Sequence, residues 1–150
     1  MTAESFWLDF LTQTGRPAET PLLETFHFDL TEEWADKLLA LVLSGQKQAT
    51  ASSLWAYEKD GDRMPQTGDL SIVTDWAGEP RCVIETTAVT VLPFREMTYD
   101  ICRREGEDDS LASWKAGHTR FFTREGEALG YAFSEDMPVV FEDFRVVWPK

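Results

Sequence analysis

A lysine and a threonine three residues apart are the pair in this sequence whose types and spacing could do chemistry. Lys47 and Thr50 lie in residues 44–53, which hold one lysine and several hydroxyl side chains. Lysine is the one base in this stretch that could activate a neighbouring hydroxyl as a nucleophile. If the chain turns here from helix to strand, both side chains can point into one pocket. The structural alternative makes Lys47 a solvated cation at a helix end, while the Thr and Ser residues favour a strand.

The elements that must position this pair are predicted from hydrophobic periodicity and capping residues. Apolar residues at helical spacing indicate a helix over 3–14, and a second helix begins near Asp29 or Thr31 and ends at Gly45, which tolerates a positive φ. Asp69, after Gly68, is predicted to stabilise a turn before a strand. The remaining expectations are a short strand near 26–28, helical segments over 54–59, 97–104 and 110 to about 124, and strands over 70–75, 81–91 and 139–148, the last of them bulged.

Helices at the start and before the last strand, with strands between them, indicate an α+β fold. A chain of 150 residues is most simply one domain. Closing a small sheet into a barrel would remove its exposed edges, and we expect such closure here.

Composition and charge narrow the classes of function. The chain is 43% hydrophobic and 13% aromatic, which is ample for a packed core and argues against disorder. Its formal net charge of -13 removes the electrostatic basis for tight non-specific binding to nucleic acid. A single nucleotide or nucleoside could still bind, because stacking and hydrogen bonds then replace phosphate attraction.

Neither metal ligation nor a cofactor is indicated by the sequence. Cys82 and Cys102 have no metal-ligand spacing and are predicted to be free buried thiols, and His27 has no partner His or Cys nearby. No signal peptide and no apolar run long enough for a membrane span are evident. We therefore expect a cytoplasmic protein without a membrane partner, and the sequence does not indicate an oligomeric state.

Several short motifs follow one another in a characteristic order. They are residues 43–50 after a helix, with Gly45-Gln46-Lys47 as a Gly-x-Lys signature, 65–69 before a strand, 105–111 leading to Trp114, His118 with Phe121 and Phe122, and 139–144. In this order and spacing the chain resembles the ASCH family, whose barrel is related to the PUA domain. The resemblance covers roughly residues 25 to 148. It implies an ASCH domain over 25–150, preceded by an N-terminal helical extension over 1–24.

The resemblance also implies a small PUA-like β-barrel with flanking helices and a cleft that receives the Gly-x-Lys segment. The ASCH family was proposed to bind RNA, and some small bacterial members are amidohydrolases that remove the acetyl group from N4-acetylcytidine. Those members use a lysine, a threonine three residues later and a glutamate farther on. Lys47 and Thr50 match the first two, and the glutamate is Glu105 or Glu107. A basic residue that often follows the signature is absent, since residues 51–53 are Ala-Ser-Ser.

The function implied is hydrolysis of an amide in a modified nucleoside such as N4-acetylcytidine, or in a related small molecule. In this hypothesis Thr50 is the nucleophile, and Lys47 takes its proton because partial burial lowers the lysine pKa. Glu105 or Glu107 protonates the leaving amine or orients the lysine, and backbone N–H groups near the turn hold the oxyanion. The alternatives are a non-catalytic PUA-like module that binds RNA or a nucleoside, and a ribonuclease.

Residues near the signature and several aromatic side chains are candidates for substrate binding. The set consists of Gly45, Ser52, Ser53, Trp55, Tyr57 and Trp114. The aromatic members, and Phe121 with them, could stack a base; the alternative is that they fill the core. His118 is interpreted as a hydrogen-bonded structural histidine. The expected ligand is a small nucleoside or an RNA-derived molecule.

Overall fold

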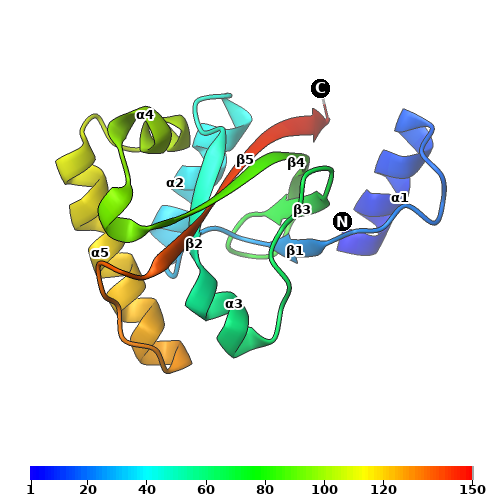
Figure 1. Cartoon of the computed structure of the whole chain (residues 1–150). Helices are drawn as coiled ribbons and strands as arrows, with labels where there is room; N and C mark the ends of the chain where they lie inside the picture. Colours follow the sequence, from blue (N-terminus) through cyan, green and yellow to red (C-terminus); the bar gives the residue numbers. More distant parts are fainter. Residues whose placement is uncertain (150) are drawn as a thin grey trace.

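The computed structural model describes residues 1–149, which form one curled sheet with helices packed around it (Figure 1). The helices are α1 (Ala3–Thr14), α2 (Glu32–Leu43), α3 (Leu54–Asp60), α4 (Tyr99–Cys102) and α5 (Leu111–Leu129), with 3-10 turns at Phe94–Glu96 and Arg103–Glu105. The strands are β1 (Glu24–Phe26), β2 (Ala49–Ser53), β3 (Leu70–Thr74), β4 (Pro80–Pro93) and β5 (Pro138–Trp148).

The sheet has the strand order β1-β3-β4-β5-β2, with β1 parallel to β3 and every other pair antiparallel. The long central strand β4 pairs with β3 on one side and with β5 on the other. Its register against β5 shifts between Thr86 and Ala88 and again between Val83 and Ile84. Such bulges bend a strand and increase its twist, which explains the curl of β4 and β5. The sheet is a half-barrel whose two edges are β1 and β2.

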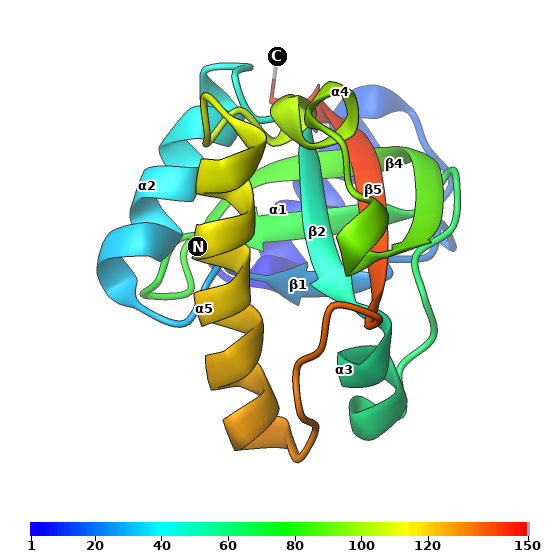
Figure 2. The same cartoon turned by 60° about the vertical axis from the view of Figure 1, so that its left-hand side comes forward.

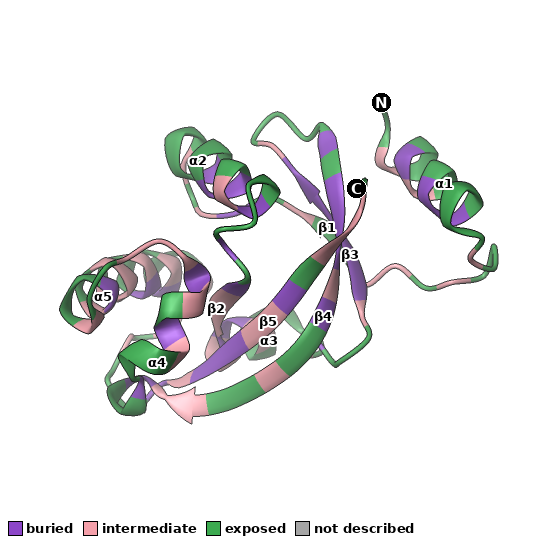
Figure 3. Ribbon diagram, turned by 90° about the horizontal axis from the view of Figure 1, so that it is seen from above, coloured by how far each residue is buried: buried purple, intermediate pink, exposed green. Residues whose placement is uncertain are grey.

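Three apolar clusters attach the helices to this sheet. Figure 3 marks the buried positions along the helices and strands. Helix α1 packs through Phe6, Phe10 and Leu11 against β3 and β4. Helix α2 packs through Leu38, Leu39 and Val42 against β3, β4 and β5. Helix α5 contributes Trp114 and Phe122 to a cluster shared with β2 and β5. Helices α2 and α5 lie beside each other (Figure 2), and residues of both line one pocket.

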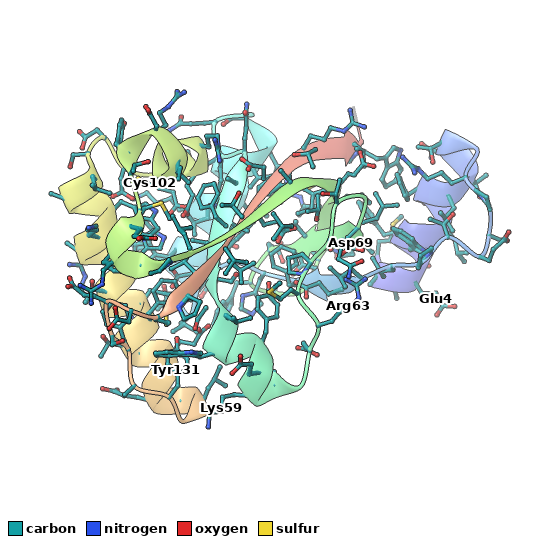
Figure 4. The ribbon with its side chains drawn as sticks, viewed as in Figure 1. Glu4, Lys59, Arg63, Asp69, Cys102 and Tyr131 are labelled. Atoms are coloured by element: carbon teal, nitrogen blue, oxygen red, sulfur yellow. The ribbon has the colours of Figure 1, made fainter. Side chains whose placement is uncertain are left out.

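The predicted α+β fold is confirmed, as are most of the predicted elements. Thr31 caps α2, and the carboxylate of Asp69 accepts a hydrogen bond from Gln66 N at 2.6 Å. Arg63 also pairs with Asp69 beside that turn (Figure 4). Both cysteines are free and buried.

Some boundaries differ from the prediction. The helix expected over 97–104 is only α4 followed by a 3-10 turn, while α5 continues to Leu129 before Gly130 ends it. Barrel closure is partial, because β1 and β2 pair on one side only within residues 1–149. None of the helices in the described part of the chain is both long and apolar enough to span a membrane. The domain boundary at residue 24 stays a prediction.

The packing of α1 yields a test of whether this helix is integral to the core. Phe10 is fully buried, whereas Leu8 on the same helix is 53% exposed. We expect Phe10→Ala to lower the free energy of unfolding by about 3–5 kcal/mol, because it leaves a cavity between α1 and the sheet. Leu8→Ala is the matched control and should change it by less than about 0.5 kcal/mol. Urea denaturation measures the free energy of unfolding of both variants. If Phe10→Ala lowered it no more than Leu8→Ala does, α1 would be a loosely attached extension.

Candidate functional site

The chain turns from α2 into β2 through a tightly bonded helix end. Gly45 has a φ of 85°, and its N–H donates to Val42 O at 3.1 Å. The N–H groups of Gln46 and Lys47 both donate to Leu41 O at 3.0 Å. This bonding pattern around a left-handed glycine is the Schellman motif, which satisfies the last carbonyl groups of the helix. The backbone N–H groups of 45–47 are thus engaged, so the expectation that N–H groups at this turn hold an oxyanion is wrong for them.

This turn is joined to the segment that precedes α5. Gln48 N donates to Arg104 O at 3.0 Å, and Gln46 Nε2 donates to Gly106 O at 2.7 Å. The backbones approach so closely that a Cβ on Gly106 would lie 2.2 Å from Gln46 O. These contacts bring residues 46–48 and 104–107 together although they are far apart in sequence.

The Lys47 side chain is buried between these two segments, at only 2% exposure. Its Nζ donates to Ala49 O at 2.7 Å, to Glu105 Oε2 at 3.3 Å and to Glu107 Oε2 at 2.5 Å. The amine therefore has three acceptors, two of which are carboxylates. The alternative of a solvated cation at a helix end is excluded by this burial.

The other carboxylate oxygen of Glu105 is held by two residues of α5. Trp114 Nε1 donates to Glu105 Oε1 at 2.9 Å, and His118 Nε2 lies 3.3 Å from the same oxygen. The His118 ring stacks on Trp114 with 4.0 Å between centroids, and its Nδ1 lies 2.9 Å from Trp114 O. Both ring nitrogens thus face oxygen acceptors, which an imidazolium with two N–H donors satisfies best. Glu105 is fixed at both of its oxygens.

Burial and charge act in opposite directions on the pKa values of these groups. Burial would lower the pKa of Lys47, but Glu105 and Glu107 outweigh it and raise that pKa above its usual value. Burial would raise the pKa of Glu105, but Lys47 and His118 hold it well below the usual range. For Glu107, burial raises the pKa to about 7, because the nearby charge of Glu105 adds to burial and Lys47 only partly offsets both. His118 has a raised pKa, because Glu105 outweighs burial.

The expectation that burial lowers the Lys47 pKa is therefore wrong. Two carboxylates next to one amine favour the ammonium form more strongly than loss of solvent disfavours it. In the free protein Lys47 is therefore an ammonium, while the pKa of Glu107 is about 7.

The cluster opens into a pocket of about 410 Å³ between α2 and α5. Lys47, Thr50, Glu105 and Glu107 all line it, together with Ala51. One wall comes from α2 and the residues just before it, namely Phe28, Asp29, Trp34 and Leu38. The other comes from α5 and the segment just before it, namely Asp108, Ser113, Gly117, His118, Arg120, Phe121 and Arg124. The four residues proposed as catalytic thus meet at one cavity.

The six residues proposed to bind substrate do not line this pocket. Gly45 lies just after the end of α2, and Ser53 caps α3 while its hydroxyl contacts Met137 Sδ at 3.0 Å. Trp55 packs edge-on against Tyr131, which lies near the far end of α5 (Figure 4). Ser52 lies on β2 and Tyr57 on α3, and burial raises the pKa of the Tyr57 phenol. Trp114 is fully buried beneath His118 and acts on the site through Glu105.

The sequence reasoning missed several residues that the pocket brings together. The aromatic side chains in its wall are Phe28, Trp34 and Phe121, of which only Phe121 was a stacking candidate. His118 was assigned a structural role, yet it also contacts a carboxylate of the site. Arg120 and Arg124 were not considered. The signal that could have found them is their spacing from Gly117, which places 117, 120, 121 and 124 on one face of a helix.

Comparisons with known proteins agree with this architecture. A family model described as the ASCH domain matches residues 24–148. The crystal structure of protein EF3133 from Enterococcus faecalis V583 is 32% identical, with a TM-score of 0.88 over 96% of this chain and 86% of that chain. The ASCH domain from Lactobacillus crispatus JV V101 is 37% identical, with a TM-score of 0.84 over 97% of this chain and 96% of that one. None of the curated proteins compared with this chain matches it.

The raised pKa of Glu107 predicts how the free energy of unfolding changes with pH. A carboxyl with a pKa near 4.5 when unfolded and about 7 when folded stabilises the fold below pH 4.5 and loses that contribution as the pH rises to 7. We therefore expect the free energy of unfolding of the wild type, relative to Glu107→Gln, to fall by on the order of 2–3 kcal/mol between pH 4.5 and 8.

Urea denaturation across this pH range measures that difference. Glu127→Gln replaces an exposed glutamate of α5 and is the matched control; its stability should run parallel to that of the wild type. If Glu107→Gln also ran parallel to the wild type, the carboxyl would not be perturbed by its surroundings.

Proposed function

From the premise that this chain belongs to the ASCH domain family and has its PUA-like fold, we propose that it is an amidohydrolase. Its proposed substrate is a modified nucleoside such as N4-acetylcytidine, or a related small amide. The observation that carries the proposal is the buried Lys47 amine, shared between Glu105 and Glu107 at a pocket that Thr50 also lines.

In this mechanism Glu107 takes the proton of Lys47, a transfer that is uphill in the free protein because the pKa of Lys47 is raised above its usual value. Lys47 rests as an ammonium, so it cannot take the Thr50 proton until it gives up its own. Glu107 contacts Nζ directly and has a pKa of about 7, close to the pH at which a general base works best. When Glu107 takes the lysine proton, the neutral amine can accept the proton of Thr50.

The bond changes then balance in two stages. Thr50 Oγ attacks the acyl carbon and passes its proton to Lys47, whose ammonium stabilises the oxyanion. The tetrahedral intermediate collapses as Lys47 returns the proton to the leaving nitrogen and the C–N bond breaks. Water then attacks the acyl ester on Thr50 by the same proton route, which releases the carboxylic acid and regenerates the hydroxyl.

Glu105 has a different role from Glu107 in this scheme. Three side chains donate to its two oxygens, and its pKa is held well below the usual range. A carboxylate held in this way does not exchange protons near neutrality. Glu105 therefore positions the lysine, and Glu107 is the acid and base of the pair.

A second candidate is a module that binds a nucleoside without catalysis. The aromatic wall favours it, since Trp34 is 46% exposed and Phe28 and Phe121 line the same pocket. Such rings can stack a base whether or not the amide is cleaved. Turnover distinguishes the two candidates.

The first test follows deacetylation of N4-acetylcytidine by chromatography. We expect Thr50→Val, which removes the hydroxyl at nearly constant volume, to lower kcat at least about a thousandfold. Thr50→Ser keeps the hydroxyl and should retain most of the activity. Thr123→Val on the exposed side of α5 is the matched control and should behave as the wild type. If the wild type showed only background turnover, N4-acetylcytidine would be excluded as a substrate. If Thr50→Val turned over substrate as fast as the wild type, Thr50 would be excluded as the nucleophile.

The pH dependence of kcat/KM tests the role of Glu107. A base must be ionised to act, so activity should fall below pH 7 with an apparent pKa of about 7. Glu107→Gln should abolish that limb of the profile along with most of the activity. A limb that survives in Glu107→Gln would assign the titration to another residue.

A further inference from the structure

Two arginines of α5 line the pocket without an ion-pair partner within residues 1–149. Arg120 and Arg124 are exposed, and no carboxylate lies within salt-bridge distance of either. Their spacing of four residues places both on one face of the helix. The Arg120 guanidinium lies over Gly117, with its Nη2 3.8 Å from where a Cβ would stand. It therefore lies against the N-terminal half of α5 rather than extending straight into solvent.

The acidic residues of the same walls are already engaged. Asp29 Oδ1 accepts a hydrogen bond from Leu30 N at 2.6 Å, and Asp108 Oδ1 accepts one from Ser113 Oγ at 2.6 Å. Both carboxylates are tied to their own segments. The arginines are thus the charged groups of the outer pocket whose donors are available to a ligand.

These two unpaired arginines lie beside Asp29 and Asp108 in a protein whose formal net charge is -13, so their attraction for an anion must come from direct contact and not from a net positive field. At physiological salt the screening length is about 8 Å, so the charge of distant residues is largely screened at the pocket. A pair of arginines can therefore attract an anion locally. Guanidinium groups bind phosphate through paired N–H donors.

The positions along α5 fit a ligand that extends from the catalytic cluster to these arginines. Arg124 lies six residues beyond His118, which corresponds to about 9 Å along a helix axis. Trp34 and Phe121 line the pocket between the two helices and offer apolar surface to a base or a ribose. A pyrimidine nucleoside with a phosphate at its other end has a comparable length.

We propose that the pocket takes a phosphorylated nucleoside, with its acylated base at Lys47 and Thr50 and its 5′-phosphate at Arg120 and Arg124. This inference rests on the proposed function for the orientation of the base, and it assigns the two arginines as determinants of specificity for nucleotide over nucleoside. It involves no covalent step beyond the hydrolysis already described.

Binding measurements with cytidine and cytidine 5′-monophosphate test this proposal without requiring turnover. By calorimetry we expect the wild type to bind the monophosphate at least about tenfold more tightly than cytidine, as one or two charge-assisted contacts would give. Arg120→Ala/Arg124→Ala should remove that preference and leave cytidine binding unchanged. The matched control is Lys59→Ala/Arg81→Ala, which removes two exposed cations elsewhere with the same change in net charge and should keep the preference.

Three outcomes would overturn the proposal. The first is equal binding of both ligands by the wild type, and the second is a preference that survives Arg120→Ala/Arg124→Ala. The third is that a short oligocytidine binds more tightly than the monophosphate, with a salt slope steeper than the value of about -1.4 expected for two phosphate contacts. That result would make RNA the ligand.

Turnover of N4-acetylcytidine and of its 5′-monophosphate separates this inference from the proposed function. If kcat/KM were equal for both compounds and Thr50→Val were inactive, the proposed phosphate site would be disproved and the proposed hydrolase activity would stand. If the monophosphate bound in an arginine-dependent way but neither compound were turned over, the proposed hydrolase activity would be disproved and the phosphate site would stand.

Discussion

A positive charge enclosed away from water determines how this molecule is built. Removing an ammonium such as Lys47 from solvent costs several kcal/mol unless charges and acceptors of the protein replace the water. Glu105, Glu107 and the carbonyl of Ala49 provide that replacement. Because the two glutamates precede α5 while the lysine follows α2, the fold must hold these distant segments together. The backbone bonds between them and the Glu105 contacts from α5 all serve this arrangement.

Much of this could be predicted from the sequence. The periodicity of apolar residues gave the helices and strands, since α1, α2 and α5 each bury one stripe and β3 and β4 are rich in β-branched residues. Lys47 and Thr50 drew attention by their types and spacing, whereas the two candidate glutamates came from the resemblance to the ASCH family. The boundaries of α4 could not be predicted, because a single helical turn has too few residues to show a periodic pattern of apolar residues.

The remaining features depend on three-dimensional packing that no local pattern encodes. The Lys47 pKa depends on two carboxylates that lie 58 and 60 residues away in the sequence, and burial alone suggests the opposite direction. The sequence left Glu105 and Glu107 as alternatives, whereas both contact the amine, with Trp114 and His118 making them unequal. Which aromatic residues face the pocket depends on how α2 and α5 lie beside each other (Figure 2). From the sequence alone, Trp55 and Tyr57 were therefore as good candidates for stacking a base as Trp34.

Gly106 has a consequence for how the two segments can change. Its φ of 70° and the closeness of Gln46 O exclude any side chain at this position unless the backbones separate. Because its neighbours in the chain are the two glutamates, such a separation would withdraw both acids from the amine at once. The acidity of Glu107 is thus coupled mechanically to the path of the turn after α2. Any change that separated these two segments would therefore also change the charges that Lys47, Glu105 and Glu107 present to the pocket.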